Sequence, residues 1–269
     1  MRTLQCLGLV IAVSLMSSAA RADDAAVKRE LAPTGKLRVG IAIGNIMGAG
    51  NVIIEQPSGK SRGVAVDLGS ELAGKLGVPV EFIAHPNSGA LTNAADSNTW
   101  DAAFIPVDDE RKKRVAFGAA HIVLQSTYLV APGSSIRSYA DVDRPGVRVV
   151  GVENTATARA AAASLKNVSM THVKTGGELF ELLQSGKADA IVQSRESLTG
   201  LSARLPGSRV LDGSFLNSFV AIAVPKGKPA ALAYVTTFIE DAKASGSVRR
   251  ALDNAGLRAS VVAPAGAGP

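Results

Sequence analysis

Residues 63–84 read GVAVDLGSELAGKLGVPVEFIA, and two hydrophobic periodicities follow one another in this stretch. Apolar residues recur at helical spacing from Val66 to Leu76, and Gly77 is a typical residue at which a helix ends. The residues that follow, VPVEFIA, are mostly apolar and predict a strand. A helix that leads directly into a strand is the closing part of a β-α-β unit.

Two further apolar stretches flank this unit. KLRVGIAI (36–43) comes before it and WDAAFIPV (100–107) after it, and both predict short strands. Parallel strands need a crossover connection, which is usually a helix. The order therefore predicts an α/β fold with a mostly parallel sheet that is flanked by helices.

The later part of the chain repeats this order. The further elements are predicted at 146–152 (strand), 155–166 (helix), 176–194 (helix, turn and strand), 219–227 (strand) and 229–253 (one or two amphipathic helices). The tail at 256–269 is rich in small residues and is expected to be frayed.

Two segments resemble each other. NTWDAAFIPVDDERK (98–112) and SGKADAIVQSRESL (185–198) both run through a turn, an Asp-Ala pair, an apolar strand and a polar loop. Each loop is expected at the carboxyl end of a parallel strand, where open α/β sheets bind ligands. The repetition predicts two similar lobes that face one another across a cleft.

The first residues, 1–22, have the pattern of a cleavable signal peptide. An early Arg2 precedes an apolar run at 7–16 that is too short to span a bilayer, and Ala20-Arg21-Ala22 is a small-x-small cleavage site. Cys6 precedes the apolar run, so we expect it to carry no lipid anchor. Cleavage would remove this only cysteine and lower the net charge of +6 by two. The remaining basic residues are scattered without interleaved aromatic residues, and we expect no nucleic-acid binding.

Motifs for catalysis, metals and cofactors are missing from the sequence. The three histidines lie far apart, Gly59-Lys60-Ser61 lacks the first glycine of a P-loop and predicts a polar hairpin turn, and no G-x-S-x-G occurs. We expect no catalytic residue, no cofactor and no metal site.

The charge cluster DDERKKR (108–114) ends the strand at 100–107 abruptly. Asp108 is expected to cap a helix that begins beside it, and the later basic residues are expected on its solvated face. Arg111 can be one more surface charge, or it can grip a carboxylate, because a guanidinium offers a planar pair of donors that cannot lose their charge.

In order along the chain, several stretches together resemble the family 3 periplasmic solute-binding proteins, the amino-acid-type receptors of ABC importers, over residues 34–262. These stretches are GKLRVGIAIGN (35–45), SRGVAVDLGSELAGKLGVPVEFI (61–83), the segment from Trp100 to Ile136, GVRVVGVENTATA (146–158), SGKADAIVQS (185–194) and FVAIAVPKG (219–227).

This resemblance implies a type II periplasmic-binding-protein-like fold. Lobe 1 would comprise residues 34–129 plus 222–262, and lobe 2 residues 130–221. Two hinge strands, near 127–130 and 219–223, would join the lobes, and the lobes would close around a ligand.

The resemblance also implies site residues. Arg111 falls on the turn whose arginine grips the ligand carboxylate in the family, and Thr155 and Thr157 fall on the loop that takes its other oxygen. Ser194 stands where the family commonly has an acid for the α-ammonium group, and this departure makes a carboxylate without an amino group one plausible ligand. If the ligand does carry an ammonium group, Asn45, Glu196 or backbone carbonyls would bind it instead. Phe104 lies near the site.

The predicted function is that of a periplasmic, monomeric substrate-binding component that delivers an amino acid or related small carboxylate to the membrane permease of an ABC importer. A dehydratase-like enzyme on this fold would need a general acid, for which Glu196 is the candidate. A third hypothesis is an exported accessory protein that senses a ligand.

Overall fold

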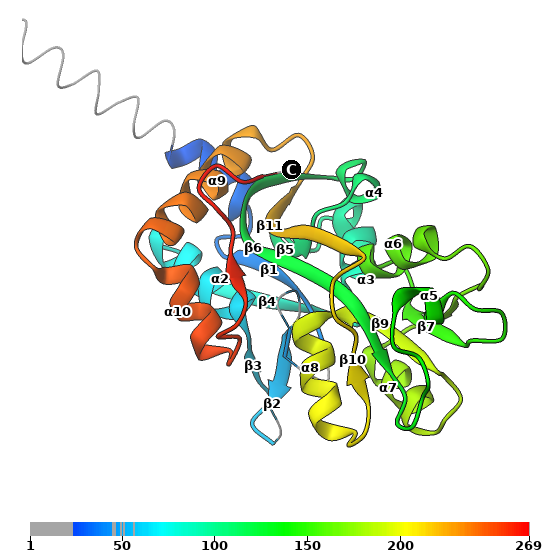
Figure 1. The fold of residues 1–269 in the computed structure, drawn as a ribbon. Helices are drawn as coiled ribbons and strands as arrows, with labels where there is room; N and C mark the ends of the chain where they lie inside the picture. The colour runs from blue at the N-terminus through cyan, green and yellow to red at the C-terminus, as the bar shows by residue number, and fades with distance from the viewer. Residues whose placement is uncertain (1–23, 45–46, 49, 51, 56, 269) are drawn as a thin grey trace, which may run out of the picture.

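The computed structural model describes residues 24–44, 47–48, 50, 52–55 and 57–268 (Figure 1). The predicted signal peptide and Asn45 lie outside the described residues. The strands are β1 (Leu37–Ala42), β2 (Ile53–Glu55), β3 (Lys60–Arg62), β4 (Val80–His85), β5 (Ala102–Pro106), β6 (Val115–Val130), β7 (Val149–Val152), β8 (Thr171–Val173), β9 (Ala190–Ser194), β10 (Arg209–Val210), β11 (Leu216–Pro225) and β12 (Val261–Val262).

The helices alternate with these strands as the sequence predicts. They are α2 (Val64–Leu76), α3 (Ser88–Asn93), the short η1 (Ala94–Ser97), α4 (Asp109–Lys112), α5 (Tyr139–Val142), α6 (Ala156–Ser164), α7 (Gly176–Gln184), α8 (Arg195–Arg204), α9 (Pro229–Ala244) and α10 (Ser247–Asn254). A further helix covers residues 24–31.

One sheet runs through the described structure in the order β4-β1-β5-β11-β6-β9-β7-β8, and β10 and β12 pair with β6. Strands β4, β1 and β5 are parallel to one another, as are β9, β7 and β8, while β11 and β6 run antiparallel to their neighbours. β2 and β3 form the hairpin predicted around Gly59-Lys60-Ser61.

The core divides into two parts. Residues 27–124 and 219–263 form two buried clusters, and residues 128–215 form two others. Within each part the clusters lie on opposite sides of the sheet, because neighbouring strand residues such as Tyr128 and Leu129 point to opposite faces. We call these parts lobe 1 and lobe 2; the exact boundaries given by the sequence stay a prediction.

β6 and β11 connect the lobes (Figure 1). β6 is one continuous strand that pairs with β11 in lobe 1 and with β9 in lobe 2. Leu124 and Gln125 face Ser218 and Asn217 between the two cores. The predicted hinge segment 127–130 pairs with β9, whereas residues 220–223 pair with β5, so the two predicted segments belong to the sheets of different lobes.

The carboxyl-terminal tail is ordered, and the prediction that it frays is wrong. β12 pairs with β6, the Ala263 N–H donates to the His121 carbonyl (3.0 Å), and the Ala120 N–H donates to the Ala267 carbonyl (2.8 Å). The tail thereby satisfies backbone groups of β6 that β11 leaves open, and buried backbone groups need such partners.

The internal resemblance has a structural counterpart in two arginine–aspartate pairs. Asp101 accepts from the backbone N–H of Arg38 (2.9 Å), from its Nε (2.9 Å) and from its Nη2 (2.7 Å). Asp189 accepts from the same three groups of Arg148, at 2.8, 2.9 and 2.7 Å. In each lobe a bidentate pair therefore ties the start of one strand to the start of its neighbour.

These two pairs differ in burial, which allows a matched comparison. The side chains of Asp101 and Arg38 are 1% and 14% exposed, those of Asp189 and Arg148 31% and 53%. We expect Asp101→Ala to lower the free energy of unfolding by about 3 kcal/mol, because it removes a buried carboxylate and leaves the Arg38 guanidinium with only Asn98 as a hydrogen-bond partner in the described structure. Asp189→Ala should cost about 1 kcal/mol or less. Urea unfolding followed by circular dichroism measures both variants. Equal losses of unfolding free energy would contradict this prediction.

His121 gives lobe 1 a pH-dependent stability. It is buried on β6, and within the described structure neither ring nitrogen has a hydrogen-bond partner. Burial, with a smaller contribution from Lys243, lowers the pKa of His121 to about 3 from its ordinary 6.5. Between these values the unfolded chain binds more protons than the folded chain, so stability falls as the pH falls from 6.5.

We therefore expect His121→Leu to unfold with a weaker pH dependence than the wild type. Relative to the wild type, the variant should gain up to about 1.4 kcal/mol of unfolding free energy for each unit by which the pH drops below 6.5. Urea titrations at pH 7.5, 5.5 and 4.5 test this, with His172→Leu, at an exposed position, as the control. A difference that stays constant with pH would refute it.

Candidate functional site

The two lobes enclose a cavity of about 100 Å³ between them. Lobe 1 lines it with residues at or after the carboxyl ends of β1, β4 and β5, such as Ile43, Asn87 and Pro106. Lobe 2 lines it from the ends of β7 and β9, with Val152 and Ser194. The cavity thus occupies the place where open α/β sheets bind ligands.

The cavity wall is polar but carries no charge in the described residues. Asn87 and Ser88 are its polar residues from lobe 1. Those from lobe 2 are Thr155, Thr157, Gln193, Ser194 and Ser197. No described lining residue is ionisable or aromatic. The volume holds several water molecules, and therefore a small polar solute.

Three helices of lobe 2 begin at this wall. Thr155 caps α6 by accepting from the Ala158 N–H, and Ser194 caps α8 by accepting from the Ser197 N–H. Gly176, the first residue of α7, also lines the cavity. The first N–H groups of a helix have no partner within it and carry partial positive charge, so these ends favour a negatively charged group in the cavity.

The structure brings three predicted site residues together at the cavity: Thr155, Thr157 and Ser194. Their hydroxyl groups already have partners. Thr155 donates to the Val152 carbonyl (2.8 Å), Thr157 shares a hydrogen bond with Ser126 (2.9 Å), and Ser194 donates to the Ser197 hydroxyl (3.0 Å). The free backbone N–H groups at the start of α6 are therefore the better donors to a ligand.

Phe104 does not line the cavity. Its ring is buried in the lobe 1 core and meets the His121 ring edge-on, with centroids 5.4 Å apart. Trp100 is fully buried as well and donates from Nε1 to the Leu91 carbonyl (3.1 Å). Asn45 is outside the described residues.

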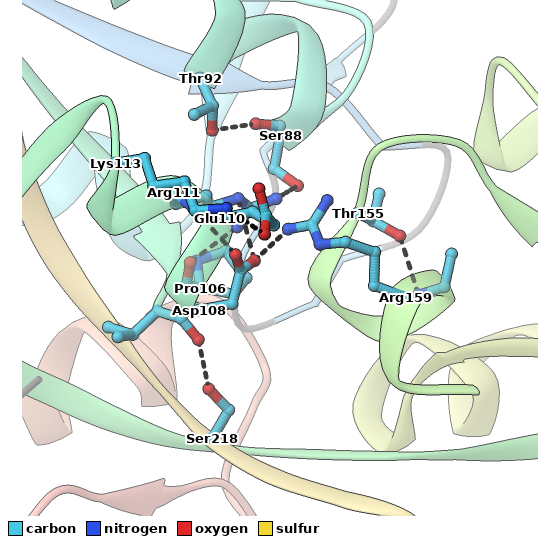
Figure 2. A network of polar contacts seen from close by, with 12 residues as sticks. Ser88, Thr92, Pro106, Asp108, Glu110, Arg111, Lys113, Thr155, Arg159 and Ser218 are labelled. Carbon is cyan, nitrogen blue, oxygen red and sulfur yellow. Dashed lines mark hydrogen bonds and ion pairs between the residues drawn. The ribbon is translucent and has the colours of Figure 1, made fainter. Parts of the chain in front are cut away.

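Arg111 lies directly behind the lobe 1 wall and is only 2% exposed (Figure 2). Its Nη1 donates to the Pro106 carbonyl (2.7 Å) and its Nη2 to the Ser88 hydroxyl (2.8 Å), and both acceptor residues line the cavity. Burial lowers the pKa of Arg111 to about 10, which leaves it charged at neutral pH. Its contact with a ligand stays a prediction.

Asp108 neutralises this buried cation and links the lobes. As predicted, it caps α4 by accepting from the Arg111 N–H (3.0 Å), and its Oδ2 lies 3.5 Å from Arg111 Nε. The same oxygen accepts from Nη2 of Arg159 on α6, so one carboxylate lies between a lobe 1 cation and a lobe 2 cation (Figure 2). Lys112 and Lys113 are exposed, as expected, and pair with Asp109 and Glu110.

Sequence reasoning missed Ser88 and Arg159. Ser88 belongs to the pair Asn87-Ser88 that comes shortly after the strand ending at His85, and such a pair is a helix-start signal that could have placed Ser88 at a strand end. Arg159 offers no local signal, because an arginine in an alanine-rich helix has the pattern of an ordinary solvated side chain.

Other contacts also hold the lobes against each other. Asn87 donates from Nδ2 to the Lys174 carbonyl of lobe 2 (2.8 Å). Gly89 approaches Asn154 so closely that a Cβ added to Gly89 would lie 2.5 Å from the Asn154 Cβ. Asn154 has a φ of 58°, a left-handed conformation that asparagine tolerates better than most residues. The structure is therefore a closed arrangement of the two lobes.

In the described part of the chain, histidine, cysteine and acidic residues nowhere gather in threes as a metal site requires. None of the helices described is long and apolar enough to cross a membrane.

The central place of Asp108 leads to a stability prediction. Asp108→Asn keeps a side-chain oxygen that can cap α4 but removes the charge between Arg111 and Arg159, so we expect a loss of about 3–5 kcal/mol in unfolding free energy. Arg159→Gln leaves the Asp108–Arg111 pair intact at a half-exposed position and should cost about 1 kcal/mol or less. Urea unfolding of both variants tests this, and a larger loss for Arg159→Gln would contradict it.

Similar proteins are known. The family model of the bacterial extracellular solute-binding proteins, family 3, matches residues 49–255. A glutamine-binding protein from Geobacillus stearothermophilus is 26% identical over 186 residues, which cover 67% of this chain and 69% of that protein.

Solved structures share the fold. A putative binding component of an ABC transporter from Wolinella succinogenes, complexed with lysine, has a TM-score of 0.73 at 25% identity and covers 82% of this chain and 95% of its own. The ancestral amino acid-binding protein AncCDT-1, a precursor of cyclohexadienyl dehydratase, has a TM-score of 0.73 at 26% identity, covering 83% and 96%. These similarities confirm the predicted two-lobed α/β fold. The family model matches well over half of this chain, and the chain therefore belongs to the bacterial extracellular solute-binding proteins of family 3.

Proposed function

We propose that this chain is the exported substrate-binding component of an ABC importer and that it binds an amino acid or a related small carboxylate between its lobes. The observation that carries the proposal is the cavity itself. It lies between two lobes at the carboxyl ends of their strands, and the guanidinium of Arg111 is hydrogen-bonded to two of its lining residues. The glutamine-binding relative and the lysine-bound structure support this ligand class.

The mode of binding in this proposal is closure. A ligand that contacts both walls stabilises the closed arrangement in which Asn87 meets Lys174 and Asp108 meets Arg159. The closed form then docks on a membrane permease, and the open form exchanges ligand. We further propose that the protein acts as a monomer in the periplasm, after cleavage of the leader at residues 1–22.

We propose binding rather than catalysis. A dehydratase needs an acid in contact with its substrate. Glu196, the candidate for that role, does not line the cavity, and its Oε1 accepts from the Ser260 hydroxyl (3.3 Å) instead. A ligand-sensing accessory protein would use the same closure, and uptake of labelled ligand by cells that lack the gene would separate sensing from transport.

Closure can be tested with a glycine variant. Gly89→Ala should weaken ligand binding by about tenfold or more, because its Cβ would clash with Asn154 only when the lobes are closed. Gly74→Ala is the matched control, since Gly74 also lies in a helix and its Cβ would meet open space.

Calorimetry with a panel of amino acids and simple carboxylates gives the affinities of the wild type and both variants. Equal affinities in all three would refute binding by closure at this cavity. The absence of any binding across the panel would refute the proposed ligand class.

A further inference from the structure

Among the residues that the structure describes, none that lines the cavity carries a charge that could neutralise an ammonium ion. Its described lining residues include no Asp or Glu. The residues between Gly44 and Val52 that lie outside the description are Asn45, Ile46, Ala49 and Asn51, none of which is acidic. An ammonium ion that enters such a site loses its hydration without gaining a counter-charge, and this is costly.

The charges that do approach the cavity are positive. The helices α6, α7 and α8 direct their amino-terminal ends at it. At the edge of the cavity, Arg111 of lobe 1 and Arg159 of α6 share the single carboxylate of Asp108, so this cluster keeps a net charge of +1. Arg111 is almost completely removed from solvent, and its Nε has no hydrogen-bond partner in the described structure.

Ser88 lies between Arg111 and the cavity and is polarised by the guanidinium. Its hydroxyl oxygen accepts from Arg111 Nη2, which leaves its own O–H available to donate to a ligand. A hydroxyl polarised by a guanidinium is a stronger donor, and its best acceptor is a carboxylate oxygen. The helix ends across the cavity can take the second oxygen of the same carboxylate.

From these observations we propose that the cavity selects a small carboxylate without an ammonium group, such as a 2-hydroxy or 2-oxo acid, over the amino acid of the same carbon skeleton. This inference rests on the proposed binding function and narrows its ligand class. Asn87, Gln193 and Ser197 supply hydrogen bonds for a hydroxyl or oxo group in place of the amino group.

Three acidic residues close to the wall have partners elsewhere, and a fourth, Glu153, is not among the residues that line the cavity. Asp108 is held by two arginines, and Glu178, on α7, accepts from the Lys174 N–H (3.0 Å). Glu196, two residues after Ser194, contacts Ser260 of the carboxyl-terminal segment and lies outside the wall. Ser194, at the carboxyl end of β9, is a lining position at which a carboxylate can be introduced.

Calorimetry with matched ligands tests the selectivity. The sets are L-alanine, L-lactate and pyruvate, and L-valine with its 2-hydroxy and 2-oxo analogues. We expect at least one hydroxy or oxo acid to bind about tenfold or more tightly than its amino acid. Amino acids that bind as tightly or more tightly would overturn the inference while the proposed binding function stands. Failure of every carboxylate and amino acid would overturn both.

A variant that is designed to reverse the ligand preference provides a second test of the selectivity. Ser194→Asp places a carboxylate at the wall, and aspartate caps α8 as well as serine does. We expect this variant to shift the preference toward the amino acid by about tenfold or more. Glu196→Gln, which removes the next acid along the chain, should leave the preference unchanged. A preference that moves with Glu196→Gln and not with Ser194→Asp would assign the ammonium site to Glu196 and refute the proposal.

Discussion

A guanidinium that is almost completely removed from water has to be neutralised and hydrogen-bonded, and this requirement organises the cleft. Arg111 meets it with the Pro106 carbonyl, the Ser88 hydroxyl and the carboxylate of Asp108. Each partner has a second role: Pro106 ends β5, Ser88 begins α3, and Asp108 caps α4. The same interactions that stabilise the charge therefore fix the wall of the cavity, and a change at Arg111 would alter both.

The Asp108 carboxylate also connects the two lobes directly. It accepts from Arg159 on α6, whose first residues line the opposite wall. Lobe closure thus brings a second cation to a site that already holds one cation and one anion. The resulting net positive charge stands at the edge of a neutral cavity, and in that low-dielectric setting a single ligand charge has a larger effect than it would in water.

The sequence allowed the repeated part of this architecture to be predicted, since strand and helix periodicities and the two Asp-Ala segments are local signals. The cap at Asp108 follows from a local pattern as well, whereas the place of Thr155, Thr157 and Ser194 at the cavity is implied by the family resemblance. Arg159 and the pairing of the tail with β6 could not be predicted, because each depends on partners far away in the chain. Phe104 lies in the middle of β5, whose residues are all buried, and the apolar pattern of this strand does not say which of its residues reaches the carboxyl end where the cavity lies.

The closed arrangement depends on few contacts between the lobes outside β6 and β11. The Asp108–Arg159 pair is partly exposed, and the Asn87–Lys174 contact is a single exposed hydrogen bond, so each contributes about 1 kcal/mol or less. Ordering the two lobes against one another costs conformational freedom, and this cost opposes closure. Because few contacts offset that cost, a ligand that contacts both walls can shift the balance toward the closed form. A weakly held closed form also releases its ligand readily, and this is the property that a binding protein needs if it is to hand the ligand on.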